Sequence, residues 1–168
     1  LCKSYRSTFE ITDFSQRIQT NHELEPIIRH GEPPAILRFE DVKQEILGIF
    51  SIISSFKKSG YTSLGIVCKT ETQARELSES LRVHTGDIHF LSNQSSAFMK
   101  GIIVTSSHMA KGLEFDEVIV PYVNAKNYNS AIDKSMLYVA VTRAMHRLTL
   151  TYNGRPSEFI PASSDQNF

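Results

Sequence analysis

The stretch GIIVTSSHMAKGLEFDEVIVP, residues 101–121, contains two mainly apolar segments separated by a polar loop. Residues 101–105 and 117–121 are typical of strands that are buried on both faces of a parallel sheet. The loop between them, residues 106–115, follows the end of the first strand. Because ligands of parallel sheets bind in the loops after the carboxyl ends of strands, we expect a ligand-binding loop here.

Strands and helices alternate on both sides of this stretch. We expect further strands at residues 35–39, 63–68, 88–91 and 148–152, and helices at residues 8–20, 42–58, 72–83 and 131–144. Ser7 and Glu10 fit a capping box for the first helix, and Asp41 fits the N-cap of the second. The alternation predicts an α/β fold with a mainly parallel sheet flanked by helices, in one domain over residues 1–155 followed by a tail over residues 156–168.

The composition excludes several classes of protein. The 168 residues include 18 Lys and Arg and 18 Asp and Glu, so any contact with nucleic acid should be local and weak in isolation, because phosphate binding usually needs a basic surface. Cys2 and Cys68 form no disulfide framework, and neither a signal peptide nor a membrane-length apolar run occurs, which favours the cytoplasm. The sequence opens on a motif without an initiator Met, so we expect a longer protein.

The segment KSYRST, residues 3–8, opens the first predicted helix. Arg6 lies just before the helix N-terminus, where free backbone N–H groups attract anions. The segment is therefore a candidate phosphate contact. The alternative is an ordinary charged residue beside a helix cap.

The loop of residues 106–115 carries several candidate ligand contacts. Its hydroxyl, imidazole and backbone groups could bind phosphate oxygens, and they belong to Ser106, Ser107, His108 and Gly112. Glu114 could accept hydrogen bonds from ribose hydroxyls, as an acidic residue does in dinucleotide folds. The alternative is a helix start capped by Ser107 with a surface Lys–Glu pair.

The third segment is MLYVAVTRAMH, residues 136–146, most of which reads as a core helix. Arg143 ends its apolar part, and a guanidinium on a rigid helix is well placed to meet charge on a transferring phosphoryl group. The alternative is an arginine that pairs with the negative end of the helix dipole.

The absence of a phosphate loop limits what the chain does by itself. The pattern G-x-x-x-x-G-K-[ST] does not occur, so the chain cannot hold Mg²⁺-ATP as P-loop enzymes do. We expect no metal site, since His84 and His89 have no clustered carboxylate or cysteine. A Ser-His-Asp hydrolase is not indicated either, because G-x-S-x-G is absent.

Four segments in order resemble motifs of the UvrD-like helicases of superfamily 1. Residues 5–8 resemble motif IV, residues 63–75 motif IVa, residues 108–115 (HMAKGLEF) motif V, and residues 137–144 (LYVAVTRA) motif VI. In that family these motifs belong to the second RecA-like domain, called 2A, and motifs I, Ia, II and III belong to domain 1A. The resemblance implies a three-layer RecA-like domain, which is a P-loop NTPase fold without its P-loop.

The resemblance also implies a role for each matched residue. The implied ATP contacts are Tyr5 at the adenine, Arg6 and Arg143 at the γ-phosphate as catalytic groups, Gly112, and Glu114 at the ribose. The implied contacts to single-stranded nucleic acid are Ser106, Ser107, His108 and Lys69, with Arg75 supporting motif IVa. The departures from the family pattern are Ser106 in place of Thr, Lys69 and Glu71 in place of Arg and Asn, and Lys134 and Ser135 in place of arginines. Arg6 and Arg143 are expected to converge on one face.

The resemblance implies the C-terminal motor domain of an ATP-dependent DNA helicase or translocase. ATP and Mg²⁺ would be held mainly by domain 1A of the full-length chain, and single-stranded DNA or RNA would be a partner, so the isolated chain is expected to be inactive. Processive members carry a 2B domain between motifs IVa and V, and the short gap here resembles the HelD branch, whose members act on RNA polymerase. The alternative is a non-enzymatic RecA-like module that only binds a partner.

Overall fold

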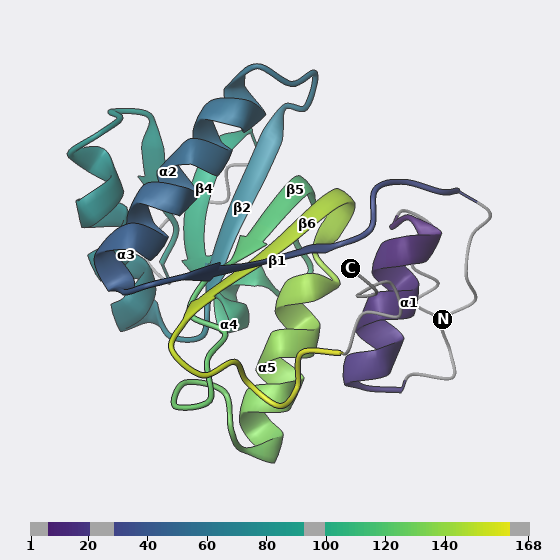
Figure 1. Ribbon diagram of the computed structural model, residues 1–168. Helices are drawn as coiled ribbons and strands as arrows, with labels where there is room; N and C mark the ends of the chain where they lie inside the picture. The colour runs from purple at the N-terminus through teal and green to yellow at the C-terminus, as the bar shows by residue number, and fades with distance from the viewer. Residues whose placement is uncertain (1–6, 21–28, 93–99, 162–168) are drawn as a thin grey trace.

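The computed structural model describes residues 7–20, 29–92 and 100–161. Its centre is a six-stranded sheet in the order β1-β6-β5-β2-β4-β3, and all neighbouring strands of this sheet run parallel (Figure 1). The strands are β1 (Ala35–Phe39), β2 (Ser63–Cys68), β3 (Ile88–Phe90), β4 (Gly101–Ser106), β5 (Phe115–Val120) and β6 (Ala144–Asn153). Because the strands are parallel, all of them begin at one edge of the sheet and end at the other, which we call the amino edge and the carboxyl edge.

Helices cover both faces of the sheet. They are α1 (Phe9–Ile18), α2 (Val42–Lys57), α3 (Glu71–Arg82), α4 (Ser107–Ala110) and α5 (Ala131–Val141). Helices α2 and α3 lie on one face, and α1, α4 and α5 lie on the other (Figure 1). The described residues therefore form three layers, as the predicted α/β fold class requires, and that prediction is confirmed.

The central strands are buried on both faces, which explains their continuous apolar sequence. All six residues of β2 are buried. Side chains that point to one face pack with Ile53 of α2, and those that point to the other pack with Ile11 and Leu137. Gly65 allows a close approach here, since a Cβ at this position would lie 2.5 Å from the ring of Phe115. The sheet is thus held by two apolar cores, one under each helical layer.

The largest correction to the predicted elements is at the end of α5. The helix was expected to continue to residue 144, but it ends at Val141, and the Arg143 carbonyl accepts from the Phe115 N–H at 2.9 Å, which pairs the chain with β5. Strand β6 then begins at Ala144 instead of residue 148. Arg143 therefore lies in the turn between α5 and β6 and not on a helix, so its expected placement on a rigid helix was wrong.

The predicted capping box of the first helix was also wrong. Thr8 is the N-cap of α1, and its hydroxyl accepts from the Ile11 N–H. The Ser7 hydroxyl instead donates to the Ala144 carbonyl at 2.7 Å, so it fastens the start of α1 to the start of β6. The predicted cap Asp41 is confirmed, since its carboxylate accepts from Gln44 N–H at 2.8 Å.

Residues after β6 continue to pack against the domain. Asn124 and Pro156 form an isolated bridge, the Ser157 hydroxyl donates to the Tyr128 carbonyl at 2.7 Å, and Phe159 and Ile160 contact the core. Ordered contacts thus extend a few residues past position 155. Within the three described ranges, every helix is too short or too polar to cross a bilayer, and His, Cys, Asp and Glu side chains form no group of three suited to a metal ion.

Candidate functional site

Arg143 is held in a fixed orientation at the amino edge. Its Nε donates to the Val139 carbonyl at 3.1 Å, one terminal nitrogen donates to the Leu113 carbonyl at 3.4 Å, and the other donates to the Thr142 hydroxyl at 3.2 Å. The side chain is half-buried. A guanidinium fixed in this way pays little conformational entropy when it meets an anion, which suits recognition of a phosphate.

The Glu114 carboxylate acts electrostatically on Arg143. Burial lowers the pKa of Arg143, and the neighbouring Glu114 carboxylate opposes this shift. The Arg143 carbonyl also accepts from the Phe115 N–H at 2.9 Å. The segments predicted as motifs V and VI therefore meet at the start of β5 and β6, where the Glu114 charge acts on the Arg143 guanidinium.

Gly112 shapes the turn that carries Glu114 to this edge. Its φ is +81°, in the left-handed region that residues with a Cβ rarely adopt, and no atom lies within 4 Å of where a Cβ would be. Leu113 N–H then donates to the Ala110 carbonyl at 3.0 Å and closes the turn. The glycine is needed here for its backbone conformation, not for lack of space.

Replacing Gly112 with alanine should lower the free energy of unfolding by about 1–2 kcal/mol, the usual cost of a left-handed conformation for a residue with a Cβ. Urea denaturation of the chain measures this. The matched control is Gly86→Ala, which also has open space but no positive φ and should change stability by less than about 0.5 kcal/mol. Equal effects of the two substitutions would contradict the role of the Gly112 turn.

The start of α1 lies at the same edge. The Ser7 hydroxyl binds the Ala144 carbonyl, and Thr8 N–H donates to the Met145 carbonyl at 3.2 Å. The segment predicted as motif IV thus adjoins the residues that follow Arg143. Tyr5 and Arg6 lie outside the described residues, so their predicted convergence with Arg143 stays a prediction.

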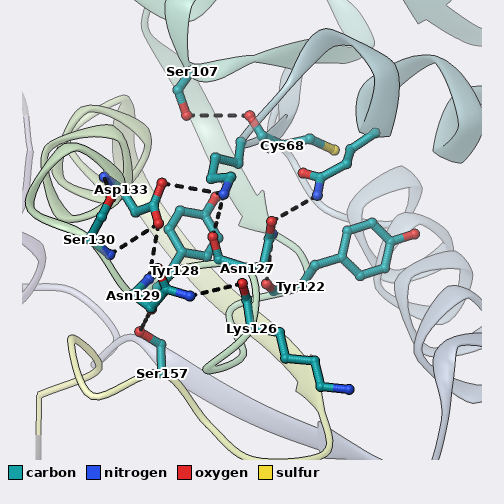
Figure 2. A network of polar contacts seen from close by, with 12 residues as sticks. Cys68, Ser107, Tyr122, Lys126, Asn127, Tyr128, Asn129, Ser130, Asp133 and Ser157 are labelled. Carbon is teal, nitrogen blue, oxygen red and sulfur yellow. Dashed lines mark hydrogen bonds and ion pairs between the residues drawn. The ribbon is translucent and has the colours of Figure 1, made fainter.

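The predicted nucleic-acid contacts lie at the carboxyl edge, and the structure separates them into two groups. His108 is exposed on α4. Ser106 and Ser107 are buried, and both hydroxyls are used internally. The Ser106 hydroxyl accepts from the Met109 N–H at 3.3 Å. The Ser107 hydroxyl donates to the Cys68 carbonyl, also at 3.3 Å (Figure 2). Their observed contacts are those of structural residues, and of the three only His108 faces solvent.

Lys69 has internal partners in place of an exposed ammonium group. Its Nζ donates to the Asn127 carbonyl, lies 3.3 Å from the Asp133 carboxylate, and is 5.8 Å from the centre of the Tyr128 ring (Figure 2). Hydrogen bonds from backbone N–H groups and from Lys69 lower the pKa of Asp133, although burial acts in the opposite direction. These contacts fasten the end of β2 to the loop before α5, which favours a structural role for Lys69.

Asn127 extends this network and was missed by sequence reasoning. Its side chain accepts from the Gln73 amide at 2.8 Å and donates to the Tyr122 carbonyl at 3.0 Å (Figure 2). Tyr122 has a φ of +60°, so the loop holds a strained backbone in place. The polar sequence of residues 124–130 indicated a loop but gave no sign that it is rigidly held.

A second missed feature is a buried carboxylate at the amino edge. Glu117 is 1% exposed, and its carboxylate lies 3.6 Å from a terminal nitrogen of Arg147. Arg147 Nε also pairs with Glu32 at 3.2 Å, and the guanidinium lies 5.1 Å from the centre of the Tyr61 ring. Burial raises the pKa of Glu117 to about 7, and the Glu32 charge adds to this while Arg147 opposes it. A charged residue inside an apolar strand was the only sequence signal for it.

Comparisons with known proteins agree with this arrangement. The family model of the UvrD-like helicase C-terminal domain matches residues 101–151, which contain the segments resembling motifs V and VI. The fold is similar to the crystal structure of the C-terminal domain of a possible DNA helicase from Lactobacillus plantarum WCFS1, with a TM-score of 0.79 and 28% identity over 94% of this chain and 92% of that chain.

A more distant likeness is to the structure of the Arterivirus nonstructural protein 10 (helicase) with DNA. Its TM-score is 0.48 at 16% identity, over 80% of this chain and 33% of that chain, which is too low to carry an argument. No sequence among the curated proteins matches this chain significantly.

The parallel sheet with helices on both faces is an α/β fold that matches the C-terminal domain of a possible DNA helicase. Within that fold, residues 101–151 match the UvrD-like helicase C-terminal domain. The recognition made from the four sequence segments is thereby confirmed at the level of the family domain.

Proposed function

We infer that this domain is the C-terminal motor half of an ATP-dependent helicase or translocase and completes an ATP site on a second RecA-like domain. The observation that carries this inference is the Arg143 guanidinium, fixed by three hydrogen bonds beside Glu114 at the amino edge. A binding module would have no need to hold an arginine in this way within reach of a carboxylate.

In this proposal Arg143 stabilises charge that develops on the transferring phosphoryl group. Glu114 accepts hydrogen bonds from the ribose, and Tyr5 and Arg6, which precede Ser7 in sequence, contribute the adenine and second phosphate contacts. ATP supplies the phosphoryl group, and the second domain holds it together with Mg²⁺. The described residues fit this division, because Arg143 offers a cation and Glu114 offers an acceptor for the ribose.

The nucleic-acid contact is assigned to the carboxyl edge. His108 is exposed there, on the short helix that follows β4. A single strand bound at this edge would be at the opposite end of the sheet from Arg143, and α5 would connect the two edges. Closing and opening of the two domains during ATP turnover would then move the strand, as in other hinge-type cycles.

A protein-remodelling role is the second candidate. Residues 69–100 connect β2 to β4 and include α3 and β3, so this connection is too short to hold a further domain. This favours a compact ATPase that acts on a protein such as RNA polymerase over a helicase with an inserted 2B domain.

The isolated 168-residue chain should show no ATP hydrolysis and only feeble ATP binding, because it lacks a phosphate loop. The full-length protein should hydrolyse ATP. A phosphate-release assay on both proteins, with the Arg143→Ala chain as a control for contaminating activity, measures this. Turnover by the purified chain that disappears in the Arg143→Ala control would contradict the half-site proposal.

A further inference from the structure

The segment of residues 29–32, which we call the bridging segment, joins the start of α1 to the start of β6. It precedes β1 and passes these two elements at the amino edge (Figure 1). Each of its four residues contacts α1 or β6: Arg29 contacts Phe9 and Met145, His30 and Gly31 contact Glu10, and Glu32 contacts Arg147. Such complete anchoring is unusual for a connecting segment, since loops are generally less constrained than the elements they join.

Arg29 is the residue that contacts both elements at once. Its backbone carbonyl accepts from Phe9 N–H at 2.8 Å, which satisfies the first free N–H group of α1. Its guanidinium donates to the Met145 carbonyl at 3.1 Å. That carbonyl also accepts from Thr8 N–H at 3.2 Å. The side chain of Arg29 therefore reinforces the junction between the start of α1 and a residue two positions after Arg143.

Glu10 and Gly31 hold the rest of the bridging segment against this junction. One carboxylate oxygen of Glu10 lies 2.7 Å from the His30 ring, and the other accepts from Gly31 N–H at 2.8 Å. These hydrogen bonds lower the pKa of Glu10, although burial acts in the opposite direction. A Cβ on Gly31 would lie 2.7 Å from the Thr8 side chain, so the segment is packed directly against the N-cap of α1.

We propose that Arg29 is a positioning residue for the ATP site: by holding the start of β6 against the start of α1, it fixes the turn that presents Arg143 to the ligand. The proposal rests on the proposed function of Arg143. Arg29 acts through a backbone carbonyl and not through the phosphate itself. A carbonyl needs only one N–H donor of the right reach, so a lysine could replace Arg29 in this role. A direct phosphate contact would instead depend on the planar, two-pronged guanidinium of arginine.

The test uses ATP hydrolysis by the full-length protein. Arg29→Met removes the donor and keeps most of the apolar stem, and it should lower kcat about tenfold with little change in KM, because the nucleotide is held mainly by the other domain. Arg29→Lys restores one donor and should return kcat to within about threefold of wild type. The matched control is Arg17→Met, an exposed arginine of α1 that pairs with Asp13 at 3.1 Å, which should change kcat less than twofold.

The outcomes separate this proposal from the proposed function. If Arg143→Ala leaves turnover intact, the proposed function fails and this inference fails with it. If Arg143→Ala is inactive but Arg29→Met retains wild-type kcat, only the positioning role is overturned. It is also overturned if Arg29→Lys is as impaired as Arg29→Met, since that result would indicate direct phosphate contact.

A second variant covers the case in which Arg29→Met does not fold. Glu10→Ala releases the bridging segment at His30 and Gly31 without altering Arg29. Glu10→Ala should also lower kcat, by about threefold or more. A thermal unfolding curve checks that the variant is folded at the assay temperature. A folded Glu10→Ala protein with unchanged kcat would count against the positioning role of the bridging segment.

Discussion

Replacing Arg143 with alanine in the full-length protein is expected to lower the rate of ATP hydrolysis by about 10³-fold or more, the usual value of an arginine that stabilises a phosphoryl-transfer transition state. The structure gives a reason for a large effect: the guanidinium is already oriented by contacts to Val139, Leu113 and Thr142 before any ligand is present. A preorganised charge needs no rearrangement when the reaction occurs. Steady-state kinetics of the wild-type and variant proteins measure the effect.

The matched controls separate lost chemistry from lost structure. Arg143→Lys keeps the charge but loses the planar fork, so it should recover only a small part of the rate. Arg38→Ala removes an exposed arginine of β1 and should leave turnover within about twofold. Circular dichroism should show Arg143→Ala to be folded, since the side chain is half-buried. Turnover by Arg143→Ala within a few-fold of wild type would remove the basis of the half-site proposal.

Local sequence was sufficient for most of the fold. The run SLGIVC predicted β2 at its observed bounds. All six of its residues are buried, so the run is continuously apolar or small, which is typical of a strand covered on both faces. Asp41 predicted the start of α2 because its carboxylate caps the first turn directly. In both places the signal and the structure depend on residues close together in the chain.

The errors arose where distant residues decide the structure. Ser7 looks like an N-cap, but its hydroxyl finds the carbonyl of Ala144, 137 positions away, and Thr8 takes over the cap. Arg143 looks like the end of a helix, but its carbonyl is taken by Phe115 of the neighbouring strand. A single sequence does not contain the pairing of β5 with β6, so neither change was visible in it.

In the candidate site, too, some residues could be predicted from the sequence and others depend on distant contacts. Glu114 and Arg143 were proposed from motif resemblance, and the structure brings them together. Lys69 was proposed as a nucleic-acid contact, but its partners Asn127 and Asp133 are 58 and 64 positions later and use its charge internally. The sequence of a lysine that follows a strand does not indicate whether its ammonium group is exposed or paired inside the protein. Only the folded structure distinguishes these two cases.

The ionisation of Glu117 should make the stability of this domain fall as pH rises. Its pKa in the folded protein is raised from 4.5 to about 7, so protonation favours the folded state. This contribution is fully present below about pH 4.5 and is lost as the pH rises through about 7. Because each pKa unit corresponds to about 1.4 kcal/mol, the loss amounts to about 3 kcal/mol at pH 8.

Glu117→Gln removes this dependence, because the amide stays neutral and keeps an oxygen for Arg147. Relative to wild type, the variant should gain about 3 kcal/mol of unfolding free energy between pH 4.5 and pH 8, measured by urea denaturation of both proteins at each pH. Exposed Glu79→Gln is the matched control and should follow the wild-type profile within about 0.5 kcal/mol. Parallel stability profiles for wild type and Glu117→Gln would contradict this prediction. They would show that Arg147, 3.6 Å from the buried carboxylate, keeps Glu117 ionised over the whole pH range despite its burial.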